Sequence, residues 1–300
     1  MQSTNPPIAI LCSDIHLSLN PPIARSKEPD WFLAMWRTLR QLWDLKEKYN
    51  VDILCAGDIF HRWNSPPELI NFALVNLPPM IAISGQHDQP YHNYDELHKS
   101  AFWTLVKAGV VEMVGNKPLI KGQLCIYGAH FGQEFPKAHR NNEDLLHVLL
   151  AHRYVWMGSS KHPKAKPEEK ATCVCTTGHD LYVLGDNHKG FYSKDISAYN
   201  CGALMRRRSD EADYLPHVGL LHADGDVEII YLDTDGESIE QDVNESEESS
   251  PTGLKELLTE LNGLQDVGLD FEEALKRISQ NKSSQVRSLL LEALNNGQSE

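Results

Sequence analysis

Short apolar runs recur along the chain, and each of them ends in polar side chains. The run at 81–90 reads IAISGQHDQP and passes from apolar or small residues to Gln86, His87 and Asp88. Apolar runs of this length, bounded by turn residues, are typical of strands buried on both faces. Ligands of α/β sheets collect at the carboxyl ends of such strands. The other runs of this kind lie at 8–16, 51–61, 145–152 and 180–188.

Helical spacing of apolar residues separates several of these runs. The longest example covers 30–50, where Trp31, Met35 and Leu39 share one face and Asp30 suits the N-cap position. A helix between two strands gives a β-α-β unit with parallel strands. Helices are also predicted at 66–77 and 95–108, strands at 80–84 and 124–130, and either a helix or the approach to a strand at 141–150.

The second half of the chain is less regular. Residues 158–178 are polar and rich in Lys and Pro, which predicts a mobile loop between two of the apolar runs. Short strands follow, and the Asp-Gly pair at 224–225 predicts a hairpin. The stretch 233–250 holds eight acidic residues and no Lys or Arg, as expected of a flexible linker. Helical spacing returns at 251–300, with caps at Thr252 and at Ser283 or Ser284.

The composition is that of a globular protein, with 41% hydrophobic and 23% charged residues among 300. No apolar stretch has the length of a membrane span, and no secretory signal is apparent, so we expect a cytoplasmic protein without membrane contact. Three of the six cysteines lie in apolar runs, which suits reduced, buried thiols. Cys173 and Cys175, with His162 or His179, form a weak candidate for a structural zinc site.

The net charge of −14 is concentrated near the C-terminus. The stretches 233–250 and 251–300 contribute −8 and −3, so −3 remains for residues 1–232. A nucleic-acid substrate is therefore not excluded by charge. Two local basic clusters are available, Arg206–Arg208 and the lysines at 161, 164, 166 and 170, of which we interpret the lysines as solvated surface.

Taken in order, the polar strand ends resemble the signature of the calcineurin-like metallophosphoesterases. Their pattern D-x-H, G-D-x-x-(D/H), G-N-H-(D/E), H, G-H-x-H is similar to Asp14-x-His16, GDIFH at 57–61, GQHD at 85–88, His152 and GDNH at 185–188. The GDIFH form and the later NCGALMRRR segment resemble the SbcD-type DNA exonucleases within this superfamily.

The resemblance implies an α/β fold, namely a four-layer α/β/β/α sandwich. The sandwich would form a catalytic domain at 1–232, followed by the acidic linker at 233–250 and a small α-helical C-terminal module at 251–300.

The resemblance also implies a centre of two divalent metal ions. Gln86 stands where the family has Asn and Asp186 where it has His, but both keep an oxygen ligand. Oxygen and imidazole ligands without thiolate favour Mn²⁺, with Mg²⁺ or Fe²⁺ as alternatives. One ion would be held by Asp14, His16, Asp58 and His188, and the other by Asp58, Gln86, His152 and Asp186.

Three further residues receive roles from the resemblance. His87 would be the general acid, His61 would contact a phosphate oxygen, and Asp88 would orient His87. Any one of these residues could instead cap a neighbouring helix, and it is their number that favours a site. His130 is a rival to His152 for the fourth motif, although the run HVLLAH fits the expected strand better.

The preferred interpretation is a two-metal DNA nuclease acting in repair, recombination or replication. An SbcC-like ATPase partner, or self-association through the C-terminal helices, would accompany it. The rivals are a phosphomonoesterase or small-molecule phosphodiesterase on the same scaffold, and a metal-poor protein that serves as a scaffold. The GDIFH form and the arginines at 206–208 favour the nuclease, whereas the short chain leaves little room for a DNA-binding cap.

Overall fold

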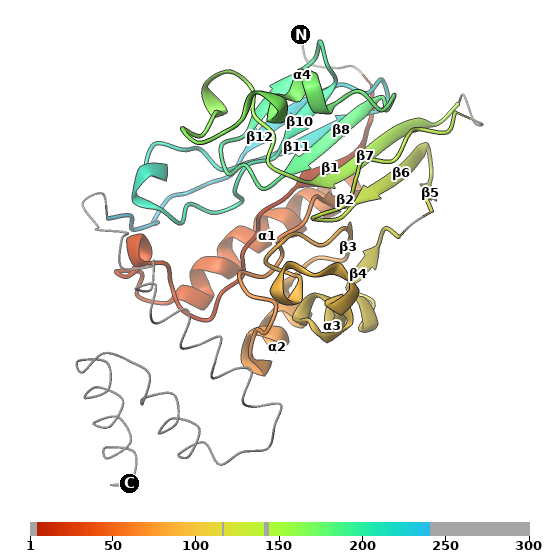
Figure 1. Ribbon diagram of the computed structural model, residues 1–300. Helices are drawn as coiled ribbons and strands as arrows, with labels where there is room; N and C mark the ends of the chain where they lie inside the picture. The colour runs from red at the N-terminus through yellow and green to blue at the C-terminus, as the bar shows by residue number, and fades with distance from the viewer. Residues whose placement is uncertain (1–4, 116, 141–143, 241–300) are drawn as a thin grey trace, which may run out of the picture. The chain divides into compact units, whose positions relative to one another are not determined.

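Two six-stranded sheets form the centre of the fold, described here from a computed structural model (Figure 1). The structure describes residues 5–115, 117–140 and 144–240. The chain divides into two units, Met1–Val243 and Asn244–Glu300, and the described residues belong to the first. The helical module predicted at 251–300 lies outside the described residues.

The first sheet is mixed and has the order β12-β11-β1-β2-β3-β4. β1 to β4 are parallel because helical segments connect them. β11 pairs antiparallel with β1 and with β12, which confirms the predicted hairpin. The strands are β1 (Pro7–Cys12), β2 (Asp52–Cys55), β3 (Met80–Ala82), β4 (Val111–Met113), β11 (His217–His222) and β12 (Val227–Tyr231).

The second sheet has the order β5-β6-β7-β8-β10-β9. Its four central strands are parallel, and the two edge strands pair antiparallel. The stretch 141–150, for which the sequence allows a helix or the approach to a strand, forms strand β7 from residue 146 onward. The strands are β5 (Leu119–Lys121), β6 (Leu124–Ala129), β7 (Leu146–His152), β8 (Leu181–Gly185), β9 (Phe191–Ser193) and β10 (Ala198–Asn200).

The sheets pack face to face, and α1, α2 and α3 cover the outer face of the first sheet (Figure 1). Leu11 and Leu54 of the first sheet meet Leu150 and Val183 of the second in a fully buried core. The predicted four-layer sandwich is thereby confirmed, with an outer layer beside the second sheet that consists of one short helix and connecting segments. The α-helices are α1 (Trp31–Tyr49), α2 (Pro67–Asn76), α3 (Ala101–Lys107) and α4 (Ala171–Val174).

Helix α1 begins and ends where the sequence predicts. Asp30 accepts a hydrogen bond from the Leu33 amide at 2.9 Å, which caps the N-terminus. Asn50 takes the left-handed conformation that commonly ends a helix. The face with Met35 and Leu39 is fully buried against the first sheet.

Two predicted segments differ in detail. The helix expected at 95–108 is broken at Ser100, whose hydroxyl accepts from the Trp103 amide and starts α3 afresh. The loop expected at 158–178 contains α4 and two short turns of helix. The 3₁₀ helices are η1 (Ile23–Arg25), η2 (Pro90–His92), η3 (Tyr94–Lys99), η4 (Gly158–Ser160), η5 (Pro167–Glu169) and η6 (Ser209–Glu211).

The segment that follows β12 is fixed to the sandwich. Glu237 forms ion pairs with Arg206 at 2.8 Å and with Arg25 at 3.3 Å, and Arg25 is almost completely buried. The Ser238 amide donates to Glu28. The chain after β12 therefore contacts the sandwich as far as residue 240, beyond the boundary predicted at 232.

Candidate metal centre

Parallel strands of both sheets end at one edge and bring the predicted ligands together. β1, β2 and β3 are neighbours in the first sheet, and β7 and β8 are neighbours in the second. The residues following them meet, because the Asp186 amide donates to both Asp14 oxygens at 3.2 Å. The strand ends carry Asp14 and His16 (β1), Asp58 (β2), Gln86 (β3), His152 (β7), and Asp186 and His188 (β8).

Four of these residues have a left-handed backbone. Their φ angles are 50° at Asp14, 51° at His16, 55° at Asp58 and 80° at Asp186. This region is disfavoured for residues with a side chain, and strain of this kind clusters at functional sites. Hydrogen bonds impose it, since the Asp14 and His16 amides donate to Gly57 O and Asp58 O at 3.0 and 2.9 Å.

Asp58 lies between histidines of the two sheets. Its Oδ1 accepts a hydrogen bond from the His87 amide at 2.9 Å. Its Oδ2 lies 3.6 Å from His16 Nε2 and 3.3 Å from His152 Nε2, so it faces one imidazole from each sheet. A carboxylate oxygen placed between two sets of ligands can be shared by two cations.

One set of ligand atoms comes from Asp14, His16 and His188. The Nε2 atoms of the two histidines are 3.1 Å apart, and Asp14 Oδ1 lies 3.7 and 3.9 Å from them. The three atoms fall within 4.8 Å of one another. Two imidazole nitrogens that face each other beside a carboxylate suit a shared cation.

A second set comes from Asp14, Asp58 and His152, with ligand atoms also within 4.8 Å. His152 Nδ1 lies 2.6 Å from Ala56 O, so the ring donates its proton there and turns Nε2 toward Asp58. A hydrogen bond on the far nitrogen is the usual way in which a metal-binding histidine is oriented.

Gln86 and Asp186, the two departures from the family pattern, contact each other. Gln86 Nε2 donates to Asp186 Oδ1 at 2.7 Å, which leaves Gln86 Oε1 as the free acceptor. That oxygen is buried and has no hydrogen-bond partner among the described residues. The carbonyl of the longer side chain is thus available as a ligand.

The donor set fits divalent cations. Among the described residues, Asp58 Oδ2, Gln86 Oε1, His152 Nε2 and His16 Nδ1 are buried without a hydrogen-bond partner. Buried polar atoms left unpaired are costly and rare, and here two of them, Asp58 Oδ2 and His152 Nε2, face each other at 3.3 Å. Oxygen and imidazole nitrogen together suit Mn²⁺, Fe²⁺ or Zn²⁺.

Burial and neighbouring charges shift the pKa values of the cluster. Burial raises the pKa of Asp14 to about 6, which shows how poorly this pocket tolerates an uncompensated carboxylate. Burial lowers the pKa of His16 well below its ordinary value, and the neighbouring His188 adds to the effect. Burial also acts to lower the pKa of His152, but the nearby carboxylates, with Asp58 first among them, together have the larger effect and raise that pKa well above the ordinary value.

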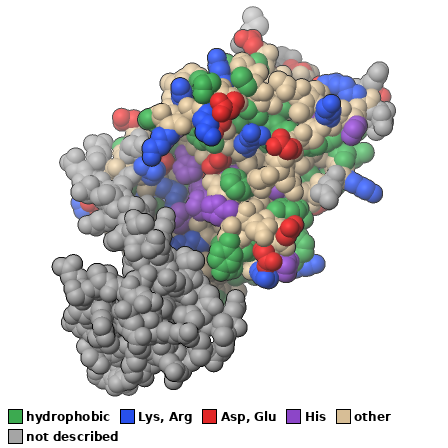
Figure 2. All heavy atoms as spheres, viewed as in Figure 1, with side chains coloured by type: hydrophobic (Ala, Val, Ile, Leu, Met, Phe, Trp, Pro, Cys, Tyr) green, Lys and Arg blue, Asp and Glu red, His purple; other side chains and the backbone are tan. Residues whose placement is uncertain are grey.

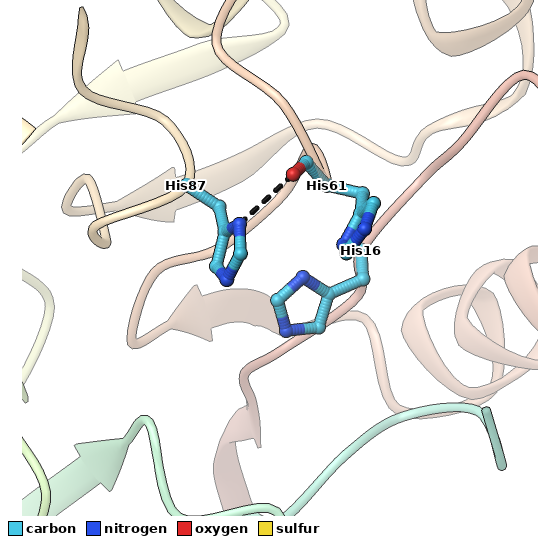
Figure 3. A group of neighbouring side chains, drawn as sticks. All are labelled: His16, His61 and His87. Carbon is cyan, nitrogen blue, oxygen red and sulfur yellow. Dashed lines mark hydrogen bonds between the residues drawn. The ribbon is translucent and has the colours of Figure 1, made fainter. Parts of the chain in front are cut away.

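His16, His61 and His87 form a histidine cluster beside the candidate ligands (Figure 3). The rings of His61 and His87 stack at 5.1 Å, and His16 meets His87 edge-on at 4.9 Å. His87 Nδ1 donates to His61 O at 2.9 Å, which fixes the ring and leaves Nε2 on its other side. Burial lowers the pKa of His61 to about 3, so its ring is neutral.

Asp88 does not contact the partner predicted for it. Its carboxylate does not orient the His87 ring, which His61 O holds instead. Asp88 accepts backbone N–H groups of Ile59, Phe60 and Gly85 at 3.2, 3.0 and 3.0 Å. It therefore joins the loop after β2 to the loop after β3 and fixes both at the site.

Glu211 is a residue that sequence reasoning missed. It is buried, and its Oε1 lies 3.4 Å from His188 Nδ1 while Oε2 accepts from the Arg207 and Arg208 amides. A carboxylate behind a histidine raises the basicity of the ligand. The available signal is the acidic pair that directly follows the three arginines in RRRSDE.

Two of those arginines act inside the protein. Arg207 is buried and donates to His16 O at 2.8 Å, so it holds the backbone of a candidate ligand. Arg206 pairs with Glu237. Arg208 alone of the three is exposed, so this cluster offers less to a nucleic acid than the sequence suggested.

The alternative ligands lie elsewhere. His130 uses both ring nitrogens in the fold, one near the Ser84 amide and hydroxyl at 2.9 Å and the other near Val114 O at 2.8 Å. The structure places His152 at the centre instead. Within the described ranges, no group of three ligand side chains includes Cys173 or Cys175, so the weak zinc candidate gains no support.

Histidine side chains gather on the face shown in Figure 2, with Lys and Arg side chains beside them. Across the described part of the chain, no helix is both long and apolar enough to cross a membrane.

The sandwich and the acids and histidines at its strand ends define the class of metal-dependent phosphoesterases. Within that class the chain belongs to the calcineurin-like phosphoesterases, whose family model matches residues 9–190. Members of this family typically bind two divalent metal ions. No curated protein matches the chain.

Several solved structures are similar to the chain at low identity. A metallophosphoesterase from Sphaerobacter thermophilus is 14% identical, with a TM-score of 0.36 over 75% of this chain and 88% of that one. The calcineurin-like phosphoesterase YfkN from Bacillus subtilis is 15% identical, with a TM-score of 0.38 over 74% and 87%. A putative 5′-nucleotidase from Staphylococcus aureus is 12% identical, with a TM-score of 0.43 over 78% and 56%.

Proposed function

We propose that the protein is a two-metal phosphodiesterase that hydrolyses DNA. The observation that carries the catalytic part is the position of Asp58 Oδ2 between His16 and His152, 3.6 and 3.3 Å from their Nε2 atoms. Two divalent ions, which we propose to be Mn²⁺, would supply an activated water and stabilise charge on the phosphoryl group. Asp14, His16, Asp58 and His188 would hold one ion, and Asp58, Gln86, His152 and Asp186 the other.

The remaining steps belong to side chains of the histidine cluster. His87 keeps Nδ1 on His61 O and would give a proton from Nε2 to the leaving oxygen. His61, buried at Nδ1, would present its ring to a non-bridging oxygen of the phosphate. Asp88 keeps the two loops that carry these histidines at a fixed separation.

DNA as the substrate rests on the GDIFH form of the second motif, which resembles the SbcD-type exonucleases. We extend the proposal to an SbcC-like ATPase as partner, or to self-association through residues 251–300. A small phosphodiester is the second candidate. It is favoured by the internal contacts of Arg206 and Arg207, which leave fewer cations for a long polyanion.

Parallel assays with Mn²⁺ test the proposal on linear duplex DNA, single-stranded DNA, bis(p-nitrophenyl) phosphate and p-nitrophenyl phosphate. Asp58→Asn serves as the control for contaminating nuclease. Cleavage of DNA that this variant abolishes supports the nuclease. Turnover of the monoester alone would make the protein a phosphomonoesterase, and no turnover of any substrate would favour the scaffold.

A further inference from the structure

A cavity of about 620 Å³ opens beside the metal centre. Its lining includes Asp186 and His188, which follow β8, and Tyr154 and Lys164 of the segment between β7 and β8. A cavity of this size accommodates a ligand as large as a nucleotide. It lies directly against the candidate ligands, so a bound substrate would extend into it.

The walls of this cavity are tied together. Asn187 lies between the two candidate ligands, is buried, and donates to Val155 O at 2.8 Å and to Ser160 O at 3.1 Å. The Tyr154 hydroxyl accepts from the His162 amide at 2.7 Å. The cavity therefore keeps a fixed position relative to the metal centre.

The acidic side chains that line the cavity have partners within the protein, whereas two of its lysines have none in ion pairs among the described residues. Glu211 is occupied by His188 and two backbone amides, and Glu169 accepts from the Lys166 amide at 2.7 Å. Lys164 and Lys189 are exposed and form no ion pair with any residue that the structure describes. The exposed Arg208 also lines the cavity.

We propose that the substrate carries a second phosphate besides the one that is cleaved, and that Lys164 and Lys189 bind this phosphate in the cavity. The inference rests on the proposed function and specifies the substrate class of that site. Hydrogen bonds between ammonium groups and phosphate oxygens are stronger than neutral ones. Both an oligonucleotide and a mononucleotide with phosphates at both ends present this chemistry.

Two esters with the same scissile bond test the proposal. They are the p-nitrophenyl ester of thymidine 5′-phosphate and the same ester with an added 3′-phosphate. The wild-type protein with Mn²⁺ is expected to prefer the second by about ten-fold in kcat/KM, through KM. The preference should disappear in Lys164→Gln/Lys189→Gln, while turnover of the first ester is retained, and it should shrink with added salt.

Lys166→Gln is the matched control, because Lys166 is exposed on the same segment but does not line the cavity. Equal kcat/KM for the two esters in the wild type, or a preference that survives in the double variant, overturns the inference and leaves the phosphodiesterase intact.

If neither ester is cleaved, the proposed function fails, and calorimetry on the Mn²⁺-loaded protein decides the inference separately. Thymidine 3′,5′-bisphosphate should then bind about ten-fold more tightly than thymidine 5′-phosphate. Equal affinities overturn it. Oligonucleotides that carry or lack a terminal phosphate show whether the second phosphate is a terminal one, as in a mononucleotide, or one of the oligonucleotide backbone.

Discussion

Gln86 Nε2 donates a 2.7 Å hydrogen bond to Asp186 Oδ1, which joins the two residues that depart from the family pattern. Gln is one methylene longer than Asn, and Asp is shorter than His. The two changes therefore compensate in reach, and the amide nitrogen bound by Asp186 directs the carbonyl oxygen of Gln86 away from it. With both substitutions present, Gln86 Oε1 therefore stays available as an oxygen ligand.

The pair should behave as a unit in metal binding. Gln86→Asn and Asp186→His are each expected to weaken binding of the second Mn²⁺, and the double variant to recover it. Coupling between contacting residues is typically about 0.5–3 kcal/mol. Titration calorimetry with Mn²⁺ measures it, with the exposed Gln123→Asn as the control. Additive effects of the two single changes would refute the coupling.

Replacing Asp58 and replacing His87 should have different effects on metal content and turnover. Asp58→Asn keeps an acceptor for the His87 amide but removes the shared charge, so metal content should fall together with turnover. His87→Gln should keep both ions while turnover of a substrate with a poor leaving group falls roughly 10²–10⁴-fold. Metal analysis beside steady-state kinetics separates the two. Full turnover by His87→Gln would show that His87 is not the general acid.

Glu211→Gln should weaken Mn²⁺ binding about 10–100-fold, because a carboxylate behind a histidine contributes to its strength as a ligand. The fold should remain intact, since Gln can still accept from the Arg207 and Arg208 amides. The exposed Glu134→Gln is a control of the same chemistry. An unchanged dissociation constant in Glu211→Gln would show that Glu211 only closes its loop.

Asp88→Asn should lower the free energy of unfolding of the metal-free protein by about 1–3 kcal/mol. The carboxylate accepts three N–H groups, whereas an amide would turn its own NH₂ toward one of the donors. Urea unfolding measures the change, with the exposed Asp95→Asn beside it. Equal stability of the two variants would contradict the role given to Asp88.

Removal of residues 244–300 should leave metal binding and hydrolysis of bis(p-nitrophenyl) phosphate unchanged. Every candidate ligand lies between 14 and 188, in the first unit of the chain. Removal from residue 233 onward should instead lower the melting temperature, because it deletes Glu237 and its ion pairs with Arg25 and Arg206. Loss of solubility in the shorter deletion would make residues 244–300 part of the fold.

Most of the sandwich could be predicted from the sequence, because buried parallel strands leave apolar runs and the ligands follow them directly. Asp14, Asp58 and His152 are recognisable for that reason. Helix α1 was equally clear, since its cap and apolar face agree. The break at Ser100 was not, because a helix and a 3₁₀ turn have similar periodicity.

The rest of the site depends on contacts that no spacing encodes. Glu211 reaches His188 from η6, 23 residues further on, and acidic residues in short connecting segments are usually solvated. Asp88 was assigned to its neighbour His87, but its bonds to backbone amides of another loop become visible only in three dimensions. Arg206 and Arg207 looked like a binding surface until their internal partners were known.

The left-handed backbone at Asp14, His16, Asp58 and Asp186 has a thermal consequence. Each such conformation costs on the order of 1 kcal/mol and persists only while the surrounding structure enforces it. The Asp14 and His16 amides enforce it through their hydrogen bonds to Gly57 O and Asp58 O. Those bonds depend on the alignment of β1 with β2, which is held by the core between the sheets through Leu11 and Leu54. Loosening that core should let the strand ends relax first. Catalysis would then be lost on heating before the sandwich itself unfolds.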